Sequence, residues 1–270
     1  MIRLTGHEFA PAATFECGQC FRWTRSDDAY VGIAGGRVCR IRDGILSCPE
    51  ADNAFWTDYF CLDMDYEAMK ADLLARDPSL APCVAYGEGL RILRQELWET
   101  IASFIISANN NIPRIRGIIE SLCRSFGEPV EFEGRQYHAF PAPERLAGLE
   151  REELAPLRAG YRDKYLLDAA RRLASGEICA GALEQLPTAE ARKALMQMKG
   201  VGGKVADCIL LFALRRYEVF PQDVWIKRVM REVYQVPERE AASFAASTYG
   251  GFGGFAQQYL FYYYRDHAGE

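Results

Sequence analysis

Residues 198–208 read Met-Lys-Gly-Val-Gly-Gly-Lys-Val-Ala-Asp-Cys, and this stretch decides the fold. Apolar residues recur at helical spacing before and after it, so we expect one helix to end here and another to begin near Lys204. A turn of only a few residues joins the two helices. Glycine suits such a turn because its backbone takes positive φ and approaches a partner closely. The glycines of the turn are Gly200, Gly202 and Gly203.

The resulting hairpin, over about residues 190–215, is a candidate phosphate site. At the start of the second helix, several backbone N–H groups have no partner within the helix, and the helix dipole adds partial positive charge. A phosphate of DNA is one natural occupant of such a site. The alternative is a plain helix–helix turn, because glycine-rich turns often join helices.

Lys204 and Asp223 are candidate reactive groups near this hairpin. Lys204 lies in the first turn of its predicted helix, where the dipole disfavours a charged amine, and a neutral amine is nucleophilic. Asp223 precedes the next predicted helix as an N-cap, and the capping N–H groups favour its ionised form. A fixed carboxylate suits an oxocarbenium-like sugar transition state. A solvated lysine and a simple cap are the alternatives.

The composition taken alone favours a small-molecule enzyme. The 270 residues are 49% hydrophobic and 26% charged, as in ordinary globular proteins. The net charge is −5, whereas a basic face is the usual footprint of nucleic-acid binding. The hairpin resolves this conflict, because a helix N-terminus binds an anion without net positive charge. The sequence shows neither a membrane-length apolar run nor a secretory signal, so we expect a cytoplasmic, nucleoid-associated protein.

Cysteine usage argues against disulfides and metal centres. Nine cysteines are scattered along the chain, which indicates a reducing compartment. Cys17 and Cys20 have zinc-knuckle spacing, but no second Cys or His pair follows at a suitable distance. No cysteine follows Cys208, which excludes a four-cysteine iron–sulfur loop in the C-terminal region. We therefore expect no cofactor, apart from an optional monovalent or divalent cation between the hairpin and a phosphate.

The predicted fold class is α+β, an N-terminal antiparallel β-sheet domain followed by a mostly α-helical region. Short apolar runs before residue 50 alternate with Asp-Asp, Gly-Gly and Asp-Gly turns, a pattern typical of β-hairpins. We expect a β domain with flanking helices over 1–88 and an all-helical region in two subdomains over 89–270. A loop or a small excursion is expected at 127–143. Helices are expected at 65–76, 96–108, 113–126, 142–149, 152–157, 161–175, 189–198, 204–215, 224–233, 238–248 and 255–267.

Four further stretches complete a family resemblance. Residues 18–23 read Gly-Gln-Cys-Phe-Arg-Trp, residues 109–114 read Asn-Asn-Asn-Ile-Pro-Arg, and residues 160–162 read Gly-Tyr-Arg. Residues 255–261 contribute Phe-Ala-Gln and Leu-Phe. Together with the hairpin, its lysine and the following aspartate, these stretches resemble the 8-oxoguanine DNA glycosylases of the helix-hairpin-helix superfamily. The short N-terminal β region resembles a compact, bacterial-type member.

The resemblance implies a bifunctional DNA glycosylase and abasic-site lyase of base excision repair. Lys204 would attack the sugar and form a Schiff base, and Asp223 would stabilise the positive charge that develops. The partner would be duplex DNA that contains 8-oxoguanine, with cytosine preferred opposite the lesion, and the protein would act as a monomer. The hairpin glycines would hold a DNA phosphate.

The same resemblance implies a pocket for a flipped base. The main-chain carbonyl of Gly18 would accept the N7 hydrogen that 8-oxoguanine has and guanine lacks. Gln257 would bind the Watson–Crick edge, and Cys208 and Phe261 would sandwich the ring. Gln257 and Phe261 are an i,i+4 pair, as are Lys204 and Cys208, so two helices could each present a polar group beside a packing surface.

Four residues would act on the other strand. Asn109 would fill the gap left in the duplex, Tyr161 would wedge the stack, and Arg114 and Arg162 would hold the unpaired cytosine. Phosphate binding is the commoner role of arginine at a DNA interface and remains the alternative.

One departure and two other functions stay open. Trp225 stands where eukaryotic members carry a phosphate-contacting histidine, which puts that contact in doubt. Another helix-hairpin-helix glycosylase of different base specificity is the first alternative function. A non-catalytic hairpin module that only tethers a protein to DNA is the second, but such a module needs neither Lys204 nor Asp223.

Overall fold

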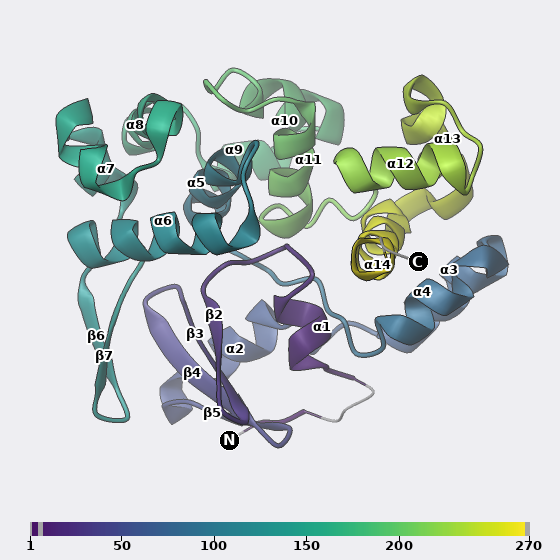
Figure 1. The fold of residues 1–270 in the computed structure, drawn as a ribbon, viewed down its shortest axis with the longest axis horizontal. Helices are drawn as coiled ribbons and strands as arrows, with labels where there is room; N and C mark the ends of the chain where they lie inside the picture. The colour runs from purple at the N-terminus through teal and green to yellow at the C-terminus, as the bar shows by residue number, and fades with distance from the viewer. Residues whose placement is uncertain (1, 5–7, 268–270) are drawn as a thin grey trace.

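The computed structural model describes residues 2–4 and 8–267 and begins with an antiparallel sheet (Figure 1). The five strands are ordered β1-β5-β4-β3-β2. The turns between successive strands from β2 to β5 contain residues with positive φ, namely Asp27, Gly35, Gly36, Asp43 and Gly44. This arrangement confirms the expected hairpins. The strands are β1 Ile2–Arg3, β2 Trp23–Ser26, β3 Ala29–Ala34, β4 Arg37–Arg42 and β5 Ile45–Ser47.

Helices form most of the remaining chain, which confirms the α+β class. Most lie within two or three residues of the predicted ranges. The short helices α1, α2, α4 and α9 lie outside those ranges, and the expected helix at 152–157 is a 3₁₀ helix, Arg151–Leu157. No helix in 2–4 or 8–267 is both long and apolar enough to cross a membrane. The helices are α1 Pro11–Phe15, α2 Asn53–Tyr59, α3 Tyr66–Arg76, α4 Ala81–Tyr86, α5 Leu97–Ser107, α6 Ile112–Phe126, α7 Pro143–Ala147, α8 Asp163–Ala174, α9 Ala180–Gln185, α10 Thr188–Leu195, α11 Gly203–Phe212, α12 Val224–Glu232, α13 Glu238–Tyr249 and α14 Gly253–Asp266.

The expectation of an all-helical 89–270 region is wrong at one place, which is the expected loop 127–143. Strands β6 Pro129–Phe132 and β7 Arg135–His138 form a hairpin there. Glu133 and Gly134 both have positive φ, as a two-residue hairpin turn requires. Glu133 also pairs with Arg40 of β4 at 2.8 Å, so the hairpin is held against the first sheet by a distant residue. Figure 1 shows it descending beside that sheet.

Two buried cores underlie the fold. The smaller core, between the sheet and α2, is rich in aromatic side chains such as Phe15, Trp23 and Trp56. The larger core surrounds α5 and joins the remaining helices. Helices α3 and α4, which precede residue 88, belong to the larger core, and α4 packs against α14. The expected boundary at residue 88 therefore does not separate the two cores.

Candidate active site

The hairpin between α10 and α11 presents an open helix N-terminus. Gly200 has φ +86°, and a Cβ added there would lie 2.6 Å from the Tyr165 ring, so only glycine fits. Gly202 is the N-cap of α11 and offers no side chain to the first N–H groups of the helix. Gly202 and Gly203 are exposed. The free N–H groups thus face solvent, as an anion site requires.

Lys204 lies in the first turn of α11, half-buried above an aromatic ring. Its Nζ is 5.1 Å from the centroid of Phe104, which α5 supplies. Among the described residues, no carboxylate forms an ion pair with it. The amine is therefore held in place by ring and helix rather than by a counter-ion, and its Nζ remains open to a ligand.

Asp223 is the N-cap of α12, as the sequence predicts. Its Oδ1 accepts the N–H of Ile226 at 2.9 Å. The expectation that capping favours the ionised form is nevertheless outweighed. Burial raises the pKa of Asp223 above its ordinary value, although the Ile226 N–H and the positive charge of Lys204 act in the opposite direction. The site therefore holds a desolvated carboxylate whose charge is stabilised by its cap and by a neighbouring amine.

One small cavity brings both reactive groups together with every expected base-pocket residue. Its volume is about 40 Å³, little more than the share of one water in the liquid. It lies beside a larger cleft of about 660 Å³, which Asn109 and Trp225 also line. A purine needs more room than the small cavity offers, so the pocket must open to admit one. The cavity is lined by Gly18, Lys204, Cys208, Asp223, Gln257 and Phe261, among others.

Phe261 packs beside Gly18 in the lining of this cavity. Gly18 has φ +78°, and an added Cβ would lie 3.1 Å from the Phe261 ring. The ring is only partly buried, whereas Gln257 is 5% exposed. The amide of Gln257 has no hydrogen-bond partner in the described part of the chain. Burial raises the pKa of Cys208 to about 11, so its thiol is neutral at physiological pH and offers a soft surface rather than a thiolate.

Two buried glutamines that sequence reasoning missed hold the Gly18 loop. Gln258 of α14 donates its Nε2–H to the Cys17 carbonyl at 2.6 Å. Gln19 donates to the Thr14 and Arg91 carbonyls at 2.9 and 2.7 Å, and its Oε1 accepts the Leu93 N–H at 2.8 Å. The Gly18-Gln19 motif was visible in the sequence. The backbone groups that the Gln19 and Gln258 side chains bind could not be read from it.

The four expected opposite-strand residues gather around the loop that joins α5 to α6. Asn109 is exposed at its tip, with φ +49°. The Arg162 guanidinium, 3% exposed, donates to the carbonyls of Ala108 and Asn109, the latter at 2.9 Å. Tyr161 lies over Arg162 at 4.5 Å and is 44% exposed.

Arg114 differs from Arg162 in being free to move. Arg114 is exposed, and its single side-chain hydrogen bond, to the Arg158 carbonyl, is 3.3 Å long. Arg162 instead donates its hydrogen bonds to backbone carbonyls of the protein, so its guanidinium is not directed at an unpaired base. Contact between Arg162 and cytosine stays a prediction.

No metal centre is formed by the residues that the structure describes, since nowhere do three His, Cys, Asp or Glu side chains come together. Cys17 and Cys20 are both buried as free thiols. Burial raises the pKa of each thiol, which disfavours the thiolate that zinc requires.

Comparison with known proteins gives a consistent pattern. Residues 1–101 match the family described as the N-terminal domain of 8-oxoguanine DNA glycosylase. Residues 102–247 match the family described as the HhH-GPD superfamily base excision DNA repair protein. The N-glycosylase/DNA lyase OGG1 of Arabidopsis thaliana is 28% identical over 287 residues, which cover 96% of this chain and 78% of that protein.

Two solved structures are similar over nearly the whole chain. MBOgg1, solved in complex with a low-affinity DNA ligand, has a TM-score of 0.92 and 44% identity over 97% of this chain and 94% of that one. The Clostridium acetobutylicum 8-oxoguanine glycosylase/lyase was solved with DNA containing cytosine opposite 8-oxoguanine. It has a TM-score of 0.91 and 38% identity, over 97% of this chain and 93% of that one.

Proposed function

This chain belongs to the HhH-GPD superfamily of base excision DNA repair proteins, and we propose that it is an 8-oxoguanine DNA glycosylase with abasic-site lyase activity. One observation carries the proposal. Lys204, Asp223 and the four expected base-pocket residues line a single cavity, although they come from a loop, two helices and a helix cap that are far apart in sequence. A hairpin that only tethered a protein to DNA would need no such cavity.

The reaction begins when the damaged nucleotide leaves the duplex and its base enters the cavity. The Lys204 amine attacks C1′ through its nitrogen lone pair, a C1′–N bond forms, the bond from C1′ to the base breaks, and the departing base takes up the proton that the amine gives up. The sugar carries positive charge during this step, and the Asp223 carboxylate stabilises it. Ring opening then gives a Schiff base, and loss of a C2′ proton expels the 3′ phosphate. The second step is the lyase reaction.

Recognition of the lesion depends on a hydrogen bond that 8-oxoguanine can form and normal guanine cannot. The Gly18 carbonyl accepts the N7 hydrogen of 8-oxoguanine, whereas guanine presents an acceptor there. Gln257, which has no protein partner in the described chain, binds the Watson–Crick edge. The neutral Cys208 thiol and the Phe261 ring hold the two faces of the base.

Cytosine opposite the lesion is the preferred partner in this proposal. Arg114 is exposed and can swing to the O2 and N3 acceptors of cytosine. Arg162 contributes once its carbonyl bonds are exchanged for the base, and Asn109 and Tyr161 fill and wedge the duplex. The open N-terminus of α11 holds a phosphate, with a cation as an optional bridge, and Trp225 of the larger cleft stacks on a nucleotide.

The chemistry requires no cofactor, because an amine and a carboxylate supply every step. Excision should therefore continue in excess chelator. A loss that added zinc restores would contradict this part of the proposal.

A borohydride trap tests the proposal directly. Borohydride reduces a Schiff base to a stable amine, so an 8-oxoguanine:cytosine duplex should become covalently bound to the protein. Single-turnover excision should be fastest opposite cytosine. Absence of a covalent band despite DNA binding would overturn the lyase assignment, and equal rates opposite all four bases would overturn the cytosine preference.

A further inference from the structure

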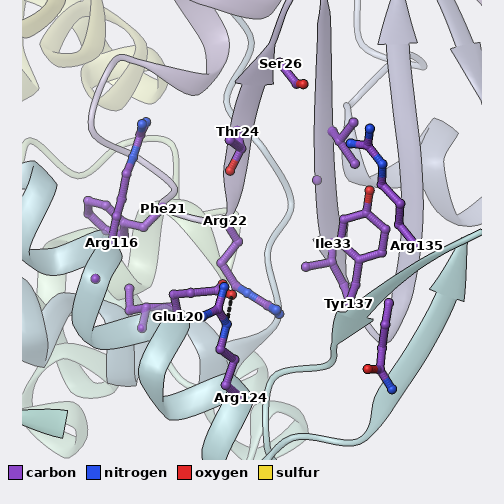
Figure 2. A pocket seen from close by; sticks show the side chains of 15 residues that line it. Phe21, Arg22, Thr24, Ser26, Ile33, Arg116, Glu120, Arg124, Arg135 and Tyr137 are labelled. Carbon is purple, nitrogen blue, oxygen red and sulfur yellow. Dashed lines mark hydrogen bonds and ion pairs between the residues drawn. The ribbon is translucent and has the colours of Figure 1, made fainter.

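A second pocket, which shares none of the residues that line the Lys204 cavity, lies between the first sheet, α6 and strand β7. Its volume is about 560 Å³. In Figure 2, α6 supplies Arg116 on one side, β7 supplies Arg135 and Tyr137 on the other, and Arg22 extends between them. Neither Lys204 nor Asp223 lines it. No step of the proposed reaction uses this pocket.

The pocket is strongly cationic in a protein whose net charge is −5. Four arginines line it against one glutamate, Glu120, which is paired with Arg124 at 2.8 Å. Arg116 and Arg135 form no ion pair with any described residue. Uncompensated cations on facing walls of one pocket are the arrangement expected of an anion site.

Two buried guanidinium nitrogens of this pocket lack an acceptor among the described residues. They are Nη1 of Arg22 and Nε of Arg116. The Arg22 side chain is only 5% exposed, and its closest carboxylate, Glu99, is 3.9 Å away. Burial raises the pKa of Glu99 to about 7, so Glu99 compensates Arg22 incompletely near neutral pH. A buried donor without an acceptor is unfavourable, and an anion in the pocket would compensate the positive charge of both guanidinium groups.

The rest of the lining suits an organic body rather than a bare ion. Phe21, Ile33 and Tyr137 provide apolar and aromatic surface, and Thr24 and Ser26 provide hydroxyl groups. The volume falls within the range of small-molecule pockets, about 300–1,000 Å³, and far exceeds that of one phosphate.

We propose that this arginine pocket binds a phosphate ester of nucleotide size, with the phosphate on the arginines and the body on Phe21 and Tyr137. The pocket is separate from the Lys204 cavity, and the inference does not depend on the proposed function. The proposed ligand is a free nucleotide. A phosphate within the DNA strand is the competing source of the same chemistry.

Calorimetric titration of the full chain with adenosine monophosphate tests the proposal, with inorganic phosphate and adenosine as partial ligands. Adenosine monophosphate should bind saturably at one site, at least tenfold more tightly than either part. Arg116→Gln and Arg135→Gln should each weaken it about tenfold or more, since each removes a charge-assisted contact. The matched control is Arg76→Gln, an arginine of α3 outside the pocket, which should change nothing.

Three results would overturn the proposal. The first is the absence of saturable binding at millimolar adenosine monophosphate. The second is binding that both pocket variants retain. The third is binding that Gln257→Ala abolishes, because this result would place the nucleotide in the base cavity. A second experiment measures binding of the 8-oxoguanine:cytosine duplex. Arg116→Gln, Arg135→Gln and the wild-type protein should bind this duplex with the same affinity. Weaker duplex binding without nucleotide binding would assign the arginines to the DNA path instead.

Discussion

The Lys204 cavity and the Asn109 loop are both partly filled by the protein's own side chains, but different contacts hold those side chains. The Phe261 ring lines the cavity, packs beside Gly18 and has no hydrogen-bonding group. The loop is held by hydrogen bonds, because the Arg162 guanidinium donates to the backbone carbonyls of Ala108 and Asn109.

This difference separates chemistry from recognition of the opposite base. The reactive groups already line one cavity in the protein alone. In the proposed complex, Arg162 must exchange its bonds to protein carbonyls for bonds to DNA, so the geometry around the opposite base forms on binding. Substitutions in the cavity should therefore act mainly on the rate of excision. Substitutions at the loop should act mainly on the choice of partner base.

The largest effect is expected from Lys204→Gln. Without the amine no Schiff base forms, so borohydride trapping should disappear and single-turnover excision should fall by on the order of 10³-fold or more. Duplex affinity should change little, because the hairpin N–H groups remain. Lys227→Gln is the matched control, since Lys227 lines the larger cleft and should leave trapping intact at saturating DNA. Undiminished trapping by Lys204→Gln would refute the assignment.

Asp223→Asn should have the next largest effect. Excision should fall about 10²- to 10³-fold because the carboxylate stabilises the transition state, while the substrate KM changes far less. The asparagine still caps α12, so stability should change by no more than about 1 kcal/mol. Asp65→Asn is the control, because Asp65 caps α3 with the same 2.9 Å bond but lies outside the site. Near-normal single-turnover excision by Asp223→Asn would leave it as a cap only.

The pH profile gives an independent readout of Asp223. In the proposed reaction, excision needs the ionised form of Asp223, and burial raises the pKa of this carboxyl group. As pH falls through this raised pKa the carboxylate gains a proton, so the rate should fall at a higher pH than for an ordinary aspartate. Asp223→Asn should lack this acid limb. Identical acid limbs in both proteins would assign the titration to another group.

Arg114→Leu should have a smaller effect, and on selectivity. A bidentate contact to a base contributes roughly 1–3 kcal/mol of discrimination, so the preference for cytosine over adenine should fall about 5- to 150-fold. If Arg114 only contacts phosphate, all duplexes should instead weaken alike, with a shallower salt dependence. Arg124→Leu, at the far end of the same helix, is the control and should leave the preference intact.

The smallest effect is expected from Gln258→Leu. Loss of its bond to the Cys17 carbonyl should loosen the Gly18 peptide, and a hydrogen bond contributes about 1 kcal/mol. Discrimination of 8-oxoguanine from guanine should therefore fall about fivefold. Gln95→Leu is the control, because it removes a similar 2.8 Å bond to Gln19, whose own side chain still anchors the loop. Unequal stability with equal discrimination would make Gln258 a structural residue only.

The sequence alone determined the features that depend on near neighbours. The glycines at 200–203 required a hairpin, Asp223 required a following helix, and paired turn residues required the β-hairpins of the first fifty residues. The identities of the cavity residues also came from sequence, through the order of matching motifs. These features were predictable because caps, turns and helical periodicity act over about four residues.

Only the tertiary structure decided how these residues are constrained. Gln258 anchors a carbonyl 241 positions away, and Arg162 holds one 54 positions away. The raised pKa of Asp223, the shape of the cavity and the position of the β6–β7 hairpin likewise depend on contacts from several elements. Burial and partner choice sum contributions from residues that meet only when the chain is folded, and no local pattern records that sum. The sequence thus named the reactive groups, and the fold set their surroundings.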